Sequence, residues 1–202
     1  MEKIMNTFKL HTLDSAPPKS APTLETVAKN FGMIPNIFAV LAESPSAVKA
    51  YLQLGELLEQ SGFTPEEQQV ISLAISVENK CSYCVAAHSF LARNIVHVAP
   101  GNIEALRRGG VLPDAKLNAL ATFTHLVVRE RGWVAESQEL REFLAAGYTN
   151  QHLLEVVMAV SMKTLSNYVN HLTETPLDGP FASETWDCPS RCKCQGHAQC
   201  NN

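Results

Sequence analysis

The stretch that decides the fold spans residues 64–88 and reads TPEEQQVISLAISVENKCSYCVAAH. It opens with a hydroxyl side chain at Thr64, proline at the next position and two glutamates, which are the capping, first-turn and dipole signals of a helix start. Residues 70–77 are almost wholly apolar, so this helix must be buried on most sides. We therefore predict a central helix here, and a second helix that begins at the C-x-x-C pair.

The rest of the chain also has helical spacing. Apolar side chains recur at intervals of three and four residues, and Pro, Ser, Asp and Gly stand where this pattern starts and stops. Alternating strand patterns bounded by hairpin turns are missing, which predicts an all-α fold class. Beyond the central pair of helices, the expected helical segments are 24–31, 37–43, 45–61, a continuation over 83–98, a short helix between 101 and 109, then 114–131, 136–146 and 149–172.

The length of 202 residues favours a single domain with short extensions. We assign residues 24–181 to one helical domain, residues 1–23 to an extended N-terminal arm that contains three prolines, and residues 182–202 to a cysteine-rich C-terminal tail. The formal charge of −4 and the 18% share of charged residues provide no basic surface for nucleic acid.

Membrane insertion and secretion are not expected either. No run of about 18 apolar residues occurs, and the first residues lack the apolar stretch of a secretory signal. We therefore expect a cytoplasmic protein, and four of its six cysteines crowd into the last fifteen positions rather than forming a disulfide framework spread over the fold.

Three reactive side chains follow the central helix: Cys81, Cys84 and His88. Their offsets of 0, +3 and +7 place them within about 60° of one helix face. A helix start stabilises a thiolate, which is the reactive form of cysteine. A thiolate, a second thiol and a proton-handling base are what a peroxidatic cycle needs, and no cofactor is required. Half of a four-cysteine zinc site, or inert thiols beside a core histidine, are the alternatives.

These residues resemble the alkylhydroperoxidase AhpD-like, or carboxymuconolactone decarboxylase, family, and within it the uncharacterised peroxidase-related proteins. The resemblance rests on the apolar run 70–77 followed by N-x-C-x-Y-C-x-x-x-H over 79–88. The motifs Ile-Pro-Asn at 34–36, Asn-Tyr-x-Asn-His at 167–171 and Thr-Pro-Leu-Asp at 175–178 support it. It covers roughly residues 24–181.

The resemblance implies an AhpD-like helical bundle, homo-oligomeric assembly and a thiol peroxidase that reduces hydroperoxides through a redox-active disulfide. By that likeness Cys84 is the peroxidatic thiol, Cys81 the resolving thiol and His88 part of a proton relay. The reductant would be an unidentified thiol or dithiol. A decarboxylase or isomerase acting on a lactone or ring acid is the alternative activity within the family.

One position departs from the family pattern. In AhpD-like enzymes a glutamate lies twelve residues before the first cysteine and completes the relay, and Gln69 occupies that position here. An amide does not take up a proton at neutral pH. Glu66 lies about 60° away on the same helix and is the nearest acid that could compensate, although it also fits a first-turn partner of the helix dipole.

The tail contains five soft ligands in thirteen residues, which are Cys188, Cys192, Cys194, His197 and Cys200. This density favours a metal site or a redox relay over chance composition. Its spacing matches no specific zinc motif, and the family likeness ends before it. A non-enzymatic metal-binding or redox-sensing module is therefore the third hypothesis, with reduced thiols or disulfides within the tail as the alternatives.

Overall fold

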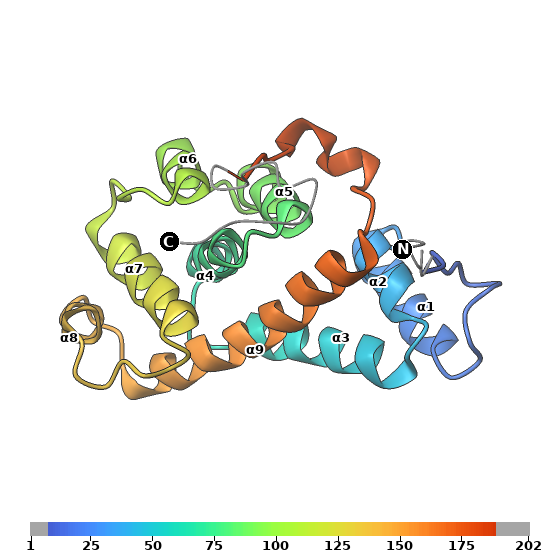
Figure 1. Ribbon diagram of the computed structural model, residues 1–202, viewed down its shortest axis with the longest axis horizontal. Coiled ribbons are helices and arrows are strands. Elements are labelled where there is room, and N and C mark those ends of the chain that lie inside the picture. The colour runs from blue at the N-terminus through green and yellow to red at the C-terminus, as the bar shows by residue number, and fades with distance from the viewer. Residues whose placement is uncertain (1–7, 189–202) are drawn as a thin grey trace, which may run out of the picture.

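The computed structural model describes residues 8–188, and within them all the regular secondary structure is helical (Figure 1). The predicted all-α class is confirmed. The elements are α1 (Ala21–Phe31), α2 (Asn36–Leu41), α3 (Pro45–Glu59), α4 (Pro65–Glu78), α5 (Ser82–Leu91), the π-helix η1 (Ala92–Val96), α6 (Pro100–Arg108), α7 (Ala115–Arg129), α8 (Gln138–Ala145), α9 (Asn150–Thr173) and the 3₁₀ helix η2 (Gly179–Glu184).

Helix α4 is the central helix that the sequence predicts. The Thr64 hydroxyl accepts a hydrogen bond from the backbone of Glu67, whose carboxylate accepts one from the backbone of Thr64, so a complete capping box begins the helix. Residues 70–76 are all buried. Figure 1 looks down α4, which packs against α7, α5 and α9. It therefore fixes the start of α5 within the interior of the protein.

A sharp turn separates α4 from α5. Lys80 adopts the left-handed conformation, with a φ of 58°, and the Cys81 amide then donates to the Ser76 carbonyl at 2.9 Å. Cys81 is the capping residue of α5, and Cys84 lies in its first turn. The helix was expected to begin at the C-x-x-C pair. It begins one residue after Cys81 instead, so only Cys84 lies within the first turn.

Helix α5 also ends earlier than predicted. It passes at Ala92 into the π-helix η1, and His97 then turns left-handed with a φ of 61°. The helical path therefore stops at Val96 rather than Val98.

Helix α9 is the longest element, with 24 residues. It crosses the molecule diagonally in Figure 1 and contacts α2, α3, α4, α5 and α7. One of its faces buries four polar side chains, which are Lys163, Ser166, Asn167 and Asn170. Helix α9 thus places the charge of Lys163 in the interior, close to α4 and α5.

The chain ends of the described region pack on this bundle. In the arm, His11 is buried, its Nε2 lies 2.7 Å from the Glu43 carboxylate, and α1 begins at Ala21 rather than after residue 23. Beyond residue 181, Trp186 is buried and its Nε1 donates to the Arg107 carbonyl at 2.9 Å. Residues on both sides of the range 24–181 therefore pack against the helical bundle. Within residues 8–188, none of the helices has the length and apolar character to cross a bilayer.

Candidate active site

The cysteine pair lies between two pockets. Cys84 and His88 line a cavity of about 430 Å³ that is enclosed by α1, α2, α3, α4, α5 and α9. Cys81 does not line this cavity and opens instead on a second pocket at the end of α9. Both thiols are buried, with exposed fractions of 1% for Cys81 and 3% for Cys84, and they are not joined as a disulfide.

The larger cavity has an aromatic wall and a small polar end. Its aromatic lining residues are Phe31, Phe38, Tyr51, Tyr83 and Phe181. Its polar end next to Cys84 is formed by Gln69, His88 and Lys163, and Glu56 and Glu59 are further polar residues of the lining. Such a cavity can hold an organic molecule with one reactive polar group directed at the thiol.

Lys163 is the residue that organises the polar end. Its side chain is fully buried, and its Nζ lies 2.6 Å from Nε2 of His88. Nδ1 of His88 in turn lies 3.0 Å from Oε1 of Gln69. Because an ammonium group only donates, Nε2 accepts from Lys163, and the imidazole proton stays on Nδ1, where it donates to Gln69.

Charge is concentrated on Lys163 and Cys84. Burial disfavours a charged lysine, but the Cys84 thiolate beside it holds the pKa of Lys163 above its usual value. The hydrogen bond from Cys81 and the charge of Lys163 outweigh burial at Cys84 and hold the pKa of that thiol well below its usual value. The lowered pKa of Cys84 and the raised pKa of Lys163 favour a thiolate beside an ammonium, and each charge stabilises the other.

Cys81 has the opposite character. Its hydrogen bond to Cys84, burial and the negative charge of Cys84 all raise the pKa of Cys81, so it stays a thiol. The Asn170 amide lies between the sulfurs, with Nδ2 at 3.3 Å from Sγ of Cys84 and 3.8 Å from Sγ of Cys81. Ser166 Oγ approaches Cys84 Sγ from another side at 3.9 Å. The site thus separates a thiolate from a proton-bearing thiol.

His88 is a neutral member of this arrangement. Burial and the nearby Lys163 charge hold the pKa of His88 well below its usual value. Gln69 accepts its hydrogen bond, so the amide orients the ring but takes no proton from it. Glu66 is half-buried and is not among the described residues that line either pocket, so its compensating role gains no support from the geometry.

Lys163 was not predicted from the sequence, and Asn167 and Asn170 entered only as part of the motif at 167–171, with no role in the site. The signal was present, because positions 163, 166, 167 and 170 have offsets of 0, 3, 4 and 7 and therefore share one helix face. A polar stripe of this kind normally faces solvent. Only the packing of α9 against α4 and α5 shows that it is buried.

The tail ligands give no metal site in the part of the chain that the structure describes. Cys188 is buried against the large core cluster, whereas Cys192, Cys194, His197 and Cys200 lie outside residues 8–188. Within that range, no group of three or more His, Cys, Asp or Glu side chains is arranged to hold a metal ion.

Residues 45–124, which contain α4, α5 and both thiols, match the model of the carboxymuconolactone decarboxylase family. This segment of the chain is similar to the carboxymuconolactone decarboxylase family. The match covers the helices that position the thiols and ends before α9. Lys163 therefore lies outside the matched segment. A comparison with curated proteins finds no match.

Solved structures share this AhpD-like fold. The alkylhydroperoxidase AhpD core protein of Ralstonia eutropha JMP134, an uncharacterized peroxidase-related protein, superposes with a TM-score of 0.75 at 22% identity, over 88% of this chain and 94% of that one. The uncharacterized peroxidase-related protein of Silicibacter sp. TM1040 has a TM-score of 0.71 at 20% identity, over 90% of this chain and 97% of that one.

A third similar structure is a Cys-to-Ala variant of the debrominase Bmp8 in complex with 2,3,4-tribromopyrrole. It has a TM-score of 0.72 at 16% identity, over 91% of this chain and 96% of that one. One fold thus includes proteins described as peroxidase-related and a debrominase, so the fold by itself does not select the reaction.

Proposed function

We propose that this protein is a thiol-dependent peroxidase that reduces hydroperoxides through a Cys81–Cys84 disulfide cycle. The observation that carries the proposal is the buried Lys163 ammonium beside Cys84, because it stabilises the nucleophilic thiolate in a cavity of organic character. A site that only packed two cysteines into the core has no use for a buried cation.

The first step consumes the hydroperoxide. The Cys84 thiolate attacks the terminal oxygen, the O–O bond breaks, and an alkoxide leaves while Cys84 becomes a sulfenic acid. The alkoxide needs a proton, and Lys163 is the charged donor that lines the same cavity. His88 and Gln69 hold Lys163 in place through the hydrogen bonds already described. Lys163 thus takes the part that the family likeness gives to the acid missing at Gln69.

The second step closes the disulfide. The Cys81 thiol loses its proton and attacks the Cys84 sulfur, and the hydroxide that leaves takes a proton to become water. One hydroperoxide and two thiols give one alcohol, one water and one disulfide. The protein needs no cofactor in this cycle, and a thiol or dithiol must then reduce the disulfide. We place the cycle in the cytoplasm, where such reductants are abundant.

The test measures consumption of cumene hydroperoxide together with the Cys81–Cys84 disulfide. The wild-type protein should form one disulfide per hydroperoxide consumed, and Cys84→Ser should consume none. A Cys192→Ser variant, in which a tail thiol is removed, is the matched control and should behave like the wild type. A Cys84→Ser variant as active as the parent would overturn the proposal, and a wild-type protein that consumes no hydroperoxide would leave a decarboxylase or isomerase as the alternative.

A second candidate is reductive dehalogenation of a small halogenated aromatic compound. The aromatic lining of the cavity and the cation beside the thiolate favour it, together with the similarity to a debrominase structure with bound tribromopyrrole. The two thiols would give two electrons, a proton would replace the halogen, and halide would leave. Release of bromide from 2,3,4-tribromopyrrole with equimolar disulfide would support it, and release of none would exclude that substrate.

We also propose that the protein assembles with further copies of itself through the outer face of α9. Leu154 and Val157 are 74% and 50% exposed one turn apart on this helix, which is unusual for large apolar side chains. Sedimentation velocity tests this. Leu154→Glu should shift an oligomer toward monomer, with Glu142→Gln on α8 as the control, and a wild-type monomer at micromolar concentration would contradict the assembly.

A further inference from the structure

The two cysteines line different pockets. The large cavity touches Cys84 and not Cys81, whereas the second pocket touches Cys81 and not Cys84. This second pocket has a volume of about 390 Å³. It is lined by Cys81, Ser82, Tyr83, Asn170, His171, Glu174 and Thr175. A hydroperoxide that occupies the large cavity therefore leaves the Cys81 side of the pair open.

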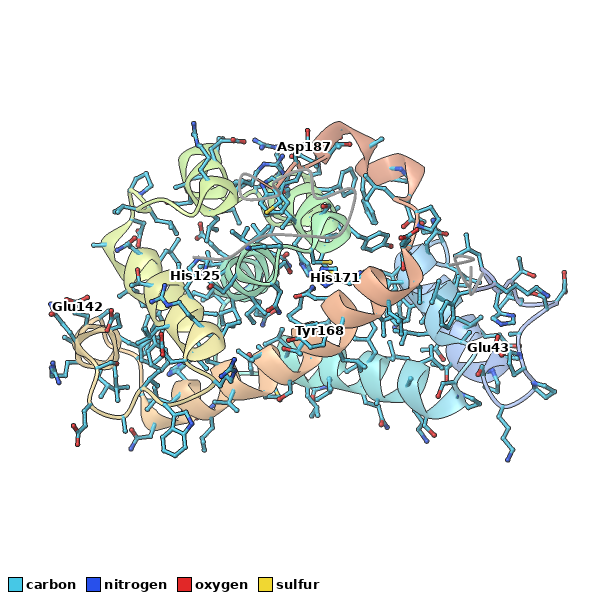
Figure 2. All side chains as sticks on the ribbon, viewed as in Figure 1. Glu43, His125, Glu142, Tyr168, His171 and Asp187 are labelled. Atoms are coloured by element: carbon cyan, nitrogen blue, oxygen red, sulfur yellow. The ribbon has the colours of Figure 1, made fainter. Side chains whose placement is uncertain are left out.

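We propose that the pocket over Cys81 is the entry port for a dithiol reductant, which attacks Cys81 of the oxidised pair while the large cavity serves the other substrate. This inference rests on the proposed disulfide cycle. Its ligand is a thiol-bearing molecule with a polar body, because the pocket is lined mainly by hydroxyl, amide, imidazole and carboxylate groups. Figure 2 shows His171 on α9, the helix that forms one wall of this pocket.

The direction of attack suits disulfide exchange. A thiolate must approach a disulfide sulfur along the S–S bond from the side opposite the leaving sulfur. For a reductant that enters over Cys81, the leaving sulfur is Cys84, on the side of Lys163. Since a better-stabilised thiolate leaves faster, the neighbouring ammonium favours this order of events over attack on Cys84.

The exchange balances as two successive transfers. The reductant thiolate bonds to Cys81 Sγ, the Cys81–Cys84 bond breaks, and Cys84 leaves as a thiolate. The second thiol of the reductant then gives up its proton and attacks the reductant sulfur that is bonded to Cys81. This closes the disulfide of the reductant and releases Cys81, which takes a proton to become a thiol. The dithiol is oxidised to its disulfide, and the protein pair gains two electrons.

Asn170 supplies an independent sign that a ligand binds here. This residue lines the pocket and has an exposed fraction of only 5%. Its Nδ2 group donates hydrogen bonds to both sulfurs. Its Oδ1 is buried, and no hydrogen-bond partner for it exists among residues 8–188. A buried acceptor without a partner costs about 1–3 kcal/mol, so a rotation of the Asn170 amide that turns this atom toward the pocket would let it accept from an incoming hydroxyl, amide or thiol group.

The test separates reduction from peroxide chemistry. The Cys81–Cys84 disulfide is prepared with diamide, so that it does not depend on peroxidase activity, and its reduction by dithiothreitol is followed by stopped flow. His171→Trp, which fills the pocket, should slow reduction at least about tenfold and leave oxidation by cumene hydroperoxide unchanged. Leu172→Trp changes the next residue, which is 74% exposed and does not line the pocket, and should leave both rates unchanged.

Charge provides a second variant that does not depend on steric fit. Glu174→Lys should raise the ratio of reduction rates for anionic mercaptoethanesulfonate over cationic cysteamine at least about threefold at low salt. Glu142→Lys makes the same charge change on α8, at the left edge of Figure 2 and away from the labelled pocket residue His171, and should leave the ratio unchanged.

The outcomes are distinct. If neither variant changes reduction, or if both change oxidation instead, the port is overturned even when the peroxidase cycle stands. If diamide-made disulfide is reduced through the pocket but peroxide never forms it, the port stands and the proposed function falls. The same reduction is also followed with reduced thioredoxin in place of dithiothreitol. If His171→Trp slows reduction by dithiothreitol alone, the port serves small dithiols, and if it slows reduction by thioredoxin alone, the port serves a protein dithiol.

Discussion

The two sides of the cysteine pair differ in charge, size and lining. Cys84 faces an aromatic cavity of about 430 Å³ and a buried ammonium, whereas Cys81 faces a polar pocket of about 390 Å³ with no cation on its lining. Two identical side chains three residues apart thereby acquire different protonation states. The hydrogen bond between the two cysteines of the C-x-x-C pair and the charge of Lys163 on α9 together produce this difference, so the cysteine spacing alone does not account for it.

Removing the charge of Lys163 should reduce the difference between the two thiols more than any other change. Lys163→Met keeps the volume and removes the charge, so the pKa of Cys84 should rise and its oxidation by cumene hydroperoxide at pH 7 should slow by about 100-fold or more. Stopped-flow tryptophan fluorescence or thiol titration measures this rate. Lys116→Met, which removes a half-exposed lysine on α7, is the control and should leave the rate unchanged.

The Lys163→Met variant also allows a prediction about the free energy of unfolding. With Lys163 replaced, Cys84 becomes a neutral thiol, so no buried charge is left unpaired. The free energy of unfolding should stay equal or rise by about 1–3 kcal/mol, as measured by urea denaturation. A loss of several kcal/mol would mean that Lys163 holds the fold together rather than serving the thiolate.

The pH dependence of alkylation should show the contrast between the thiols. Because the pKa of Cys84 is lowered and that of Cys81 raised, iodoacetamide should modify Cys84 first, at a rate that stays constant from pH 8 to below pH 7. Peptide mass spectrometry identifies the modified residue. Equal labelling of both thiols, with the rate falling below about pH 8.5 as for a free cysteine, would refute the assignment.

His88 should make the folded protein less stable in mild acid. Its pKa is lowered in the folded state, so below about pH 6.5 the unfolded chain binds a proton that the folded protein does not. The free energy of unfolding should therefore decrease as the pH falls below that value, by up to about 1.4 kcal/mol per pH unit. His88→Gln should flatten this decrease in urea unfolding between pH 7.5 and 5.5, and parallel curves would contradict it.

The smallest effect is expected at Gln69. Since Lys163 supplies the charge and the proton, Gln69→Glu should change the hydroperoxide rate at pH 7 by less than about threefold, although a carboxylate there should raise the pKa of His88. A steady-state assay with dithiothreitol as reductant measures this. A rise of tenfold or more would show that the missing acid limits the reaction after all.

Much of the fold could be predicted from local signals. Thr64 and the glutamates after it mark the start of α4 because a capping box depends only on neighbouring residues. The same holds for Gly32 and Gly109, which end α1 and α6 in the left-handed conformation. The break at η1 was missed, because a π-helix follows from packing and not from any composition in residues 92–96.

Only the part of the site that comes from α5 and its capping residue could be predicted from the sequence. Cys81, Cys84 and His88 follow from spacing along one helix and its capping residue. Lys163 contacts His88 from 75 residues further along the chain, and Asn170 contacts Cys84 from 86 residues further along. Nothing local distinguishes a buried polar stripe on α9 from a solvated one. The separation of the two thiols into two pockets likewise depends on how α9 crosses α5.

The most direct test of the central claim uses Cys81→Ser with one equivalent of cumene hydroperoxide and dimedone to trap sulfenic acid. If Cys84 attacks and Cys81 resolves, as we propose, dimedone should label Cys84 in nearly every molecule, and the Cys84→Ser variant should show no label at Cys81. Labelling of Cys81 in Cys84→Ser, or an unlabelled Cys84 after hydroperoxide treatment, would contradict the roles that the surroundings of the two thiols assign.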